Sequence, residues 1–396
     1  MASIAKRPDG RWRARYRDPS GKEHARHFPR KIDAQRWLDG ITTAVTTGTY
    51  VDPAKAQVTV GDWAAQWLRA QAHLKPSTRE RYAGIIRTHV EPSWAAVRLA
   101  DVTHAGVQSW VSDLAAKRSP STARKAHRVL SLVLSLAVRD GRLARSPASD
   151  VRLPREAPAD RHYLTHQQVR ALADASTAPP ESVAKRRIER QRRPCDYGLV
   201  ILFLAYTGAR FGEMAALRVR RLDLLARRVE IAEAVTSVNG RLTWGTPKTH
   251  ATRWIGIPAF LADTLGEQVN GLGPNDLVFT TAQGEVLRAS NFRRDVFTPT
   301  ARQLGLDGLV PHALRHTAAS LAIAAGADVK VVQQMLGHKS ATMTLDLYGH
   351  LFDDRLDDVA GALDAAARAA HGKPSNPANE RGKLISLPST TERPTR

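Results

Sequence analysis

Two stretches poor in apolar side chains interrupt the sequence and divide it into three parts of different character. The first is GTYVDPAKAQ (48–57), and the second is the proline-rich RSPASDVRLPREAPADRHY (145–163). Both are typical of linkers between domains. With 396 residues, 42% of them hydrophobic, the chain can build two or three hydrophobic cores. We therefore expect a multidomain, mainly α-helical protein with parts at residues 1–50, 58–153 and 160–370, and a disordered Pro/Ser/Arg-rich tail at 371–396.

The first part, residues 1–50, is predicted to be a small sheet of two or three strands with a helix. Residues 10–18 (GRWRARYRD) alternate basic and apolar side chains, and KEHARHF (22–28) suits a partner strand after a turn at PSG. Residues 30–45 have the apolar spacing of a helix. One strand face carries four side chains suited to contacting phosphates or a DNA groove: Arg11, Arg13, Arg15 and Arg17. A solvated sheet edge that uses charge against aggregation is the alternative.

The second part, residues 58–153, is predicted to be helical throughout. Val60, Trp63 and Trp67 share one face of its first helix, the next helix begins at Pro76, and the last stops at Asp140-Gly141. Basic side chains gather near the helix starts: Arg79, Arg81, Arg124, Lys125 and Arg128. Such helices could clamp a DNA duplex or form an ordinary bundle with a wet surface, and both interpretations stay open.

The third part is predicted to contain helices, a short strand section near 227–257 and further helices. Residues 179–194 (PPESVAKRRIERQRRP) carry six basic residues and predict an exposed insertion before the apolar helix in YGLVILFLAYTGAR. Residues 240–258 (GRLTWGTPKTHATRWIGIP) predict a hairpin with Lys248 at its tip and TRWIGIP as the return strand.

Charge and cysteine content limit the possible partners and environment. The formal net charge is +21, from 59 Lys and Arg against 38 Asp and Glu, which makes nucleic acid the first partner to consider. The single cysteine, Cys195, excludes disulfide frameworks and cysteine-based zinc sites. The sequence has neither an apolar run of about 18 residues nor a signal core, so we expect no membrane association and an intracellular protein.

Two basic residues stand where they could meet a phosphate. In YTGARFGEMAALR (206–218) an apolar helix ends at a glycine, and Arg210 begins the next helix with Glu213 one turn on. This is either an ion pair at a helix start or an arginine that offers its planar guanidinium to a phosphate. Lys248, at its predicted tip, is either solvated or able to reach into a DNA groove.

A third candidate segment is PHALRHTAAS (311–320). Pro311 begins a helix, so His312 and Arg315 lie on one face near its N-terminus, and His316 lies further round toward the core. Zinc would need a third ligand, and the segment lacks the glutamate of a metalloprotease helix. We therefore expect no metal here.

The last candidate segment is MLGHKSATMTLDLYGHLFDD (335–354). His338 follows a glycine at a turn, and Tyr348 ends the next helix. A tyrosine that attacks a phosphodiester forms a phosphotyrosyl ester and frees a sugar hydroxyl, with no need for ATP or a metal. A half-buried tyrosine at a helix end is the structural alternative.

The candidate residues occur along the chain in the order Arg, Lys, His-x-x-Arg, His, Tyr. This order resembles that of the catalytic residues in tyrosine recombinases of the phage- and mobile-element-integrase branch. TGARFGE resembles the first arginine box of that family, PKT its hairpin lysine, PHALRHTAAS its second box, and MLGHKSATMTLDLYGHLFDD its His and Tyr box. Phe211 departs from the pattern, since many relatives have a second arginine or a small polar residue there.

The resemblance implies a fold and an activity. Residues 160–370 would form the catalytic domain of the DNA breaking-rejoining type, residues 58–153 a SAM-like helical core-binding domain, and residues 1–50 an arm-type DNA-binding domain. The enzyme would be a site-specific recombinase that cleaves and rejoins DNA through a 3′-phosphotyrosyl intermediate and a Holliday junction, without a cofactor.

The resemblance also implies roles for the candidate residues. Tyr348 would be the nucleophile, and Arg210 and Arg315 would bracket the non-bridging phosphate oxygens. Lys248 would protonate the leaving 5′ oxygen, and His312 would take and return the tyrosine proton. His338 would donate a hydrogen bond to the phosphate. Behind these residues, Glu213 would orient Arg210 and His316 would brace the helix.

The implied partners are double-stranded attachment sites and three further copies of the chain. We expect a tetramer on DNA, a monomer or weak association without DNA, a bacterial cytoplasmic location at the nucleoid, and possible bending or directionality factors. An apolar stripe on an acidic helix would dock on a neighbouring protomer: Phe352, Leu356, Val359, Ala360 and Leu363. The alternatives are a type IB topoisomerase-like relaxing enzyme and a non-catalytic DNA-binding regulator.

Overall fold

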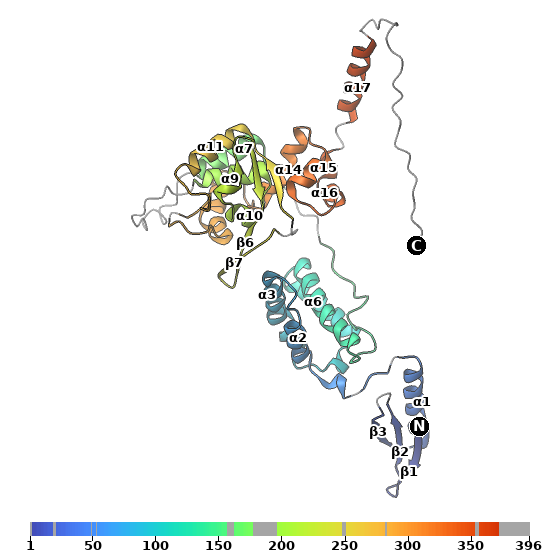
Figure 1. The fold of residues 1–396 in the computed structure, drawn as a ribbon. Helices are drawn as coiled ribbons and strands as arrows, with labels where there is room; N and C mark the ends of the chain where they lie inside the picture. The colour runs from blue at the N-terminus through green and yellow to red at the C-terminus, as the bar shows by residue number, and fades with distance from the viewer. Residues whose placement is uncertain are drawn as a thin grey trace, which may run out of the picture. The chain divides into compact units, whose positions relative to one another are not determined.

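The computed structural model (Figure 1) describes residues 2–18, 21–48, 50–52, 54–156, 162–176, 196–247, 251–281, 283–352 and 356–371. The chain separates into two compact units, residues 1–160 with 235–244 and residues 161–234 with 245–396. The predicted insertion at 179–194, Lys248 and the predicted tail from residue 372 onward lie outside the described residues.

The N-terminal segment forms a three-stranded antiparallel sheet covered by a helix. The strands are β1 (Ser3–Lys6), β2 (Trp12–Arg17) and β3 (Glu23–Phe28), with β2 in the centre, and the helix is α1 (Lys31–Thr46). Ala14 and Tyr16 of β2 are buried with Ala34 and Leu38 of α1. The intervening arginines of β2 point away from this core and are exposed, so the predicted alternation is confirmed.

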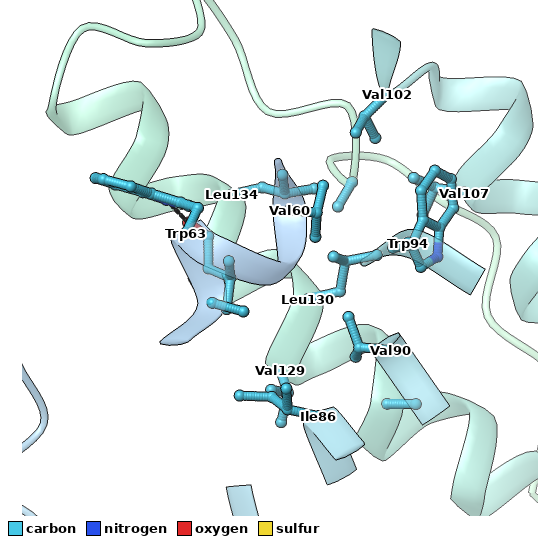
Figure 2. Packing of buried hydrophobic residues seen from close by; sticks show 14 of the residues in the cluster. Val60, Trp63, Ile86, Val90, Trp94, Val102, Val107, Val129, Leu130 and Leu134 are labelled. Atoms are coloured by element: carbon cyan, nitrogen blue, oxygen red, sulfur yellow. Dashed lines mark hydrogen bonds between the residues drawn. The ribbon is translucent and has the colours of Figure 1, made fainter. Parts of the chain in front are cut away.

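Helices form the next part of the first unit. They are α2 (Val60–Arg69), α3 (Pro76–Ile85) running into a π-helical turn (Ile86–Val90), α4 (Glu91–Trp94), α5 (His104–Lys117) and α6 (Pro120–Arg139). Figure 2 shows Val60 and Trp63 of α2 packed against Leu130 and Leu134 of α6. The indole nitrogen of Trp63 donates to the Val133 carbonyl at 3.0 Å, which satisfies a buried polar group in this core.

The segment predicted as the second linker begins as part of this helical core. Ala148 is buried, and its carbonyl bonds with Nε2 of His127 on α6 at 3.0 Å. Val151 and Leu153 also pack against the cluster. The stretch predicted to be free of the core therefore starts after Leu153 and not at residue 145, because its few apolar side chains are buried on the helices.

The second unit is built around one apolar helix, α9 (Tyr197–Thr207). It packs against α7 (His166–Ala175) on one side and α14 (Ala313–Ala324) on another (Figure 1). Because α9 is apolar on all faces, it can only be stable inside a core. The other helices between α9 and α14 are α10 (Phe211–Ala215), α11 (Ala259–Val269), α12 (Ala289–Asn291), a π-helical turn (Phe292–Phe297) and α13 (Thr298–Gln303).

The strand section differs from the predicted hairpin over 240–258. β6 (Ala234–Val238) pairs with β7 (Arg241–Gly245), whereas β8 (Arg253–Gly256) joins β5 (Arg228–Ile231) and β4 (Leu222–Asp223) in a three-stranded sheet. The prediction that TRWIGIP returns along GRLTWG was therefore wrong. The tight turn lies at Asn239 and Gly240, which have φ of 50° and 77° as a two-residue hairpin connection requires.

Among the described residues, α14 is followed by α15 (Val329–Leu336), α16 (Ala341–Tyr348), a 3-10 turn (Gly349–Leu351) and α17 (Leu356–His371). α15 packs on both α14 and α16. Val359 and Leu363 of α17 are 54% and 66% exposed, so the predicted apolar stripe has no cover at these two positions. Within the part of the chain that the structure describes, no helix is both long and apolar enough to cross a membrane.

Candidate active site

The turn between α9 and α10 fixes the first arginine. Gly208 ends α9 in the left-handed conformation with φ of 62°, a conformation that glycine adopts without a Cβ penalty. Arg210 is the residue that caps the N-terminus of α10. Its backbone N–H donates to Oε2 of Glu213 at 3.0 Å, and its Nη1 donates to Oε1 at 2.9 Å. The predicted orientation of Arg210 by Glu213 thus has a direct geometric basis.

Glu213 is buried, and besides Arg210 it binds Arg253, an arginine that was not predicted from the sequence. Arg253 of β8 donates from Nη2 to Oε2 of Glu213 at 2.6 Å and from Nη1 to Oε1 at 3.3 Å. Burial by itself would raise the pKa of the Glu213 carboxyl, but the bonds and charges of Arg253 and Arg210 hold it below its ordinary value. The carboxylate therefore stays ionised between its two arginines.

The second arginine of the predicted site, Arg315, lies in the first turns of α14 and is buried. Its Nη1 donates to the Gly208 carbonyl at 2.5 Å, and its Nη2 donates to the Leu336 carbonyl at 2.6 Å. Burial, with the charge of Arg210 acting in the same direction, lowers the pKa of Arg315 to about 9, so the guanidinium is still protonated at neutral pH. Arg315 thereby joins the turn after α9 to the end of α15.

His338 follows the turn that ends α15. Gly337 takes a left-handed φ of 65°, and Ser340 caps α16 by accepting from the Met343 N–H. His338 Nδ1 lies 3.0 Å from the Thr344 hydroxyl. Burial, followed by the charges of Arg315 and Arg210, lowers the pKa of His338 to about 4. His338 is therefore neutral near pH 7.

Tyr348 ends α16 and lies among the other predicted side chains. Its side chain is buried, and its phenol oxygen is 2.9 Å from Nδ1 of His316. The rings of His338 and Tyr348 are parallel within 6°, with centroids 6.4 Å apart. Tyr348 is near enough to Arg315 that its ionised form would raise the pKa of that guanidinium. The phenol is thus close to a buried guanidinium and to an imidazole that can accept its proton.

The two histidines of α14 differ in their relation to the tyrosine. The resemblance to tyrosine recombinases implies the proton role for His312 and a bracing role for His316. In the structure Nδ1 of His316 lies within hydrogen-bond distance of the Tyr348 oxygen, and His312 is exposed and meets the His316 ring edge-on at 5.2 Å. The periodicity of α14 placed His316 toward the core, and a helix on that side carries the tyrosine.

A cavity of about 620 Å³ opens beside these residues. Its lining includes Arg253, Trp254, Gln333, His338 and Lys339. Ala251, three residues after Lys248 in the sequence, is also part of the lining. Hydrogen-bond donors such as Lys339 and the exposed indole of Trp254 thus lie beside Arg253 in this cavity. Its volume suits the binding of a ligand.

The structure brings together all but one of the predicted catalytic and orienting residues: Arg210, Glu213, His312, Arg315, His316, His338 and Tyr348. Lys248 lies outside the described residues. Arg253 was missed, although the sequence held a signal for it. It stands two residues before Ile255 on a strand, on the face that Ile255 and Ile257 bury, where a charged residue needs a partner.

One group of side chains among the described residues has the composition of a metal site, and it lies in the first unit. Asp18, His24 and Asp52 bring their ligand atoms within 4.8 Å of one another. Asp18 accepts from the Lys22 N–H at 3.0 Å and bonds with His24 Nε2 at 2.8 Å. These contacts fix the turn between β2 and β3, and this group has no part in the site around Tyr348.

Family models match the chain along most of its length. The model described as "Phage integrase family" matches residues 162–355, "Phage integrase, N-terminal domain" matches residues 2–47, and "Phage integrase central domain" matches residues 60–153. The chain belongs to the phage integrase family of tyrosine recombinases. It is accordingly a site-specific recombinase, and the enzyme class and fold class inferred from the sequence are confirmed.

Individual relatives agree with this assignment. The recombinase is 26% identical over 366 residues to the integrase of Mycobacterium phage D29, covering 87% of this chain and 91% of that protein. It is also 26% identical over 302 residues to tyrosine recombinase XerC of Mycobacterium sp. strain JLS, covering 74% of this chain and 94% of that protein.

Solved structures share its fold. The Tn1549 transposon integrase in complex with transposon right end DNA superposes with a TM-score of 0.65 at 19% identity, covering 77% of the recombinase and 99% of that chain. A lambda integrase tetramer bound to a Holliday junction gives a TM-score of 0.56 at 20% identity, covering 86% and 96%.

The basic residues predicted to contact DNA all lie in the first unit and are exposed: Arg11, Arg13, Arg15, Arg17, Arg79, Arg81, Arg124, Lys125 and Arg128. Some have protein partners, such as Arg13 with Glu23 at 3.6 Å and Arg124 with Glu156 at 3.6 Å. Exposed pairs of this kind are weak and can exchange for a phosphate.

Proposed function

We propose that Tyr348 is the nucleophile of DNA strand cleavage. Its oxygen would attack the scissile phosphorus, form a 3′-phosphotyrosyl ester and release a 5′ hydroxyl. The observation that carries this proposal is the burial of the Tyr348 phenol next to Arg315, His316 and His338. Re-attack by a 5′ hydroxyl from another strand reverses the chemistry, and two such exchanges make and resolve a Holliday junction.

The arginines are proposed to stabilise the charge that develops on the phosphate. Arg210 and Arg315 are held by a carboxylate and by backbone carbonyls, so neither must be reorganised when the five-coordinate transition state forms. Arg315 uses two N–H groups for the Gly208 and Leu336 carbonyls, and a guanidinium carries five. Further N–H groups of Arg315 remain for phosphate oxygens. Lys248 is proposed to protonate the leaving 5′ oxygen.

Proton transfer is proposed to run through His316 of α14. With its proton on Nε2, His316 can accept the Tyr348 proton at Nδ1 across 2.9 Å. The proton would stay on His316 as an imidazolium, beside the exposed ring of His312, and return to the Tyr348 oxygen when the phosphotyrosyl ester is broken in the rejoining step. Neutral His338 would donate one ring N–H to a non-bridging oxygen.

The remaining parts of the chain are proposed to select and assemble the DNA. The arginine face of β2 would contact arm-type sites, and the basic residues of α3 and α6 would contact the core site around the scissile phosphate. We propose a tetramer on two duplexes, joined through the exposed face of α17, in line with the lambda integrase tetramer on a Holliday junction. Acting on chromosomal attachment sites, the enzyme would work in the bacterial cytoplasm at the nucleoid.

The test is covalent trapping on a suicide substrate whose nick prevents rejoining. The wild-type chain is expected to form a protein–DNA adduct linked through Tyr348 at the 3′ phosphate, located by peptide mapping. Tyr348→Phe is expected to bind the same DNA with unchanged affinity and to form no adduct. Tyr163→Phe, another tyrosine of the same unit, is the matched control and should keep adduct formation.

Each alternative predicts a different result. A DNA-binding regulator would form no adduct with either chain. A topoisomerase-like relaxing enzyme would form the adduct but no Holliday junction when two attachment sites are present. Adduct formation by Tyr348→Phe would overturn the proposed mechanism.

A further inference from the structure

Arg253 lies between the two segments that carry the proposed phosphate-binding residues. Its side chain is only 10% exposed, and it grips both oxygens of Glu213, at 2.6 and 3.3 Å. Its Nε donates to the Met335 carbonyl, in the last turn of α15, at 3.1 Å. A single planar group thus bonds at once to the carboxylate that holds Arg210 and to the segment that leads into His338.

The position of Arg253 in the sheet is fixed by the backbone. β8 is paired with β5, and Arg253 stands opposite Ile231 in the register. Strand alternation puts Arg253 on the same face as the buried Ile255. The guanidinium therefore leaves a rigid element at a fixed place, and its fork geometry suits a bidentate carboxylate contact.

The turn before His338 also packs directly on Arg253. A Cβ at Gly337 would lie 3.1 Å from both Cδ and Nε of Arg253, and Gly337 has a left-handed φ of 65°. The backbone at this turn therefore rests against the arginine side chain. A displacement of Arg253 would move the turn and with it the ring of His338.

Among the charged neighbours of Glu213, Arg253 has the largest effect on the ionisation of its carboxyl. Burial raises the pKa of Glu213, and Arg253 opposes this through a hydrogen bond and its charge, ahead of Arg210. Arg315 faces the carboxylate from α14. Glu213 also lines a small cavity together with Arg221, Glu230 and Glu233. Arg221 and Glu230 bond to each other, and Glu233 lies 3.5 Å from Arg218, so these charges are already paired.

We propose that Arg253 is a positioning residue for strand cleavage, which aims Arg210 through Glu213 and sets the turn that carries His338. This inference rests on the proposed function, because it assumes that Arg210 and His338 contact the scissile phosphate. Nε, Nη1 and Nη2 of Arg253 bond to Met335 and Glu213, the neighbours through which it would act.

The test compares Arg253→Gln and Arg253→Lys with the wild-type chain on the suicide substrate at saturating DNA. Arg253→Gln is expected to slow adduct formation by about 10- to 100-fold, while DNA affinity changes less than about twofold. Arg253→Lys keeps the charge but makes only a point contact, so it should restore part of the rate. Arg302→Gln removes one charge from the surface of the same unit, where Arg302 pairs with Asp307 and both side chains are exposed, and should leave the rate unchanged.

Two further readouts separate positioning from other roles. Without Arg253 the pKa of Glu213 should rise, so the rate deficit of Arg253→Gln should widen as the pH falls from roughly 8 to 6. Because Arg253 is proposed to act in part through Glu213, the losses of the two single variants should combine to less than their sum in the double variant Arg253→Gln/Glu213→Gln.

The outcomes are distinct. Wild-type rates and pH profile in Arg253→Gln would overturn the inference and leave the proposed function intact. Fully additive losses in the double variant would show that Arg253 does not act through Glu213, and a loss of folding in both Arg253 variants would make its role structural; either result overturns the inference. A wild-type chain that forms no adduct would overturn the proposed function first.

Discussion

At the residue scale, the neutrality of His338 predicts a specific dependence of stability on pH. The pKa of His338 is lowered from 6.5 to about 4, so the folded state binds fewer protons than the unfolded state between these values. The contribution of His338 to stability is therefore complete above pH 6.5, falls as the pH drops toward 4, and changes no further below 4. Because the ring is half-exposed, we expect a loss of at most about 2 kcal/mol.

The measurement is hydrogen exchange of the buried α9 amides at several pH values for the wild-type chain and His338→Gln. The difference in free energy of opening between the two chains should change between pH 6.5 and 4 and be constant outside this window. If the free energies of opening of the two chains ran parallel over the whole pH range, the pKa of His338 would not be lowered in the folded state. Carboxylates that titrate in the same window cancel in this difference.

The individual residues of the site were predictable to the extent that their signals are local. Arg210, His338 and Tyr348 stand at helix starts, turns and helix ends that the sequence marks with glycine and serine. Arg253 was missed because Glu213 lies 40 residues away and Met335 lies 82 residues away. Its partners follow from tertiary packing alone, and only its place on the inward face of a strand gave a local sign.

At the element scale, the turn between α9 and α10 should tolerate no side chain at Gly208. Gly208 has φ of 62°, and a Cβ there would lie 2.5 Å from Cδ2 of Leu336 and 3.2 Å from Cβ of Ala318. Gly208→Ala is expected to lower the free energy of unfolding of the second unit by about 1–3 kcal/mol, from backbone strain and displacement of Leu336. Adduct formation should slow as well, since Arg315 bonds to the carbonyls of both residues.

Gly266→Ala is the control in the same unit. Gly266 lies inside α11, and the nearest atom to an added Cβ, Cδ1 of Leu224, is 3.7 Å away, an ordinary contact. Alanine favours a helix interior over glycine by about 1 kcal/mol, so this variant should be neutral or more stable. Thermal unfolding of both variants, with adduct assays, tests the pair. Equal stability of Gly208→Ala and the wild-type chain would contradict the account of this turn.

Most helices and strands were predictable because their hydrophobic patterns and capping residues are local in the sequence. The exception is the pairing of β8 with β5. The arginine-bearing strand, the helices of residues 58–153 and the apolar helix α9 follow from periodicity and capping residues. The pairing of β8 with β5 was not predictable from its spacing, because the two strands are separated by the β6–β7 hairpin. The Asn239-Gly240 dipeptide is the local signal for that hairpin. The turn was predicted instead at the nearby Pro-Lys-Thr, which contains Lys248.

At the scale of the whole molecule, two sets of basic residues differ in their surroundings. In the first unit, the arginines of β2 and the basic residues of α3 and α6 are exposed. In the second unit, Arg210, Arg253 and Arg315 are wholly or partly buried and are held by protein acceptors. Exposed bases suit binding along a DNA backbone, whose strength falls with salt, whereas fixed arginines suit the stabilisation of one phosphate. The sequence pattern indicates on which helix or strand each basic residue lies. Only the fold shows which of these residues are exposed and which are held by protein acceptors.

Assembly on DNA should depend on the exposed face of α17. Val359 and Leu363 are 54% and 66% exposed, and apolar side chains in such a position suit an interface with another copy of the chain. Leu363→Ser is expected to leave single-site DNA binding and adduct formation unchanged and to reduce four-subunit complexes on paired sites by about tenfold or more. Arg368→Ser, on the same helix in an exposed pair with Asp364, is the control. Native gel shifts and light scattering with attachment-site DNA measure the two variants, and assembly by Leu363→Ser at the wild-type level would place the subunit contact elsewhere.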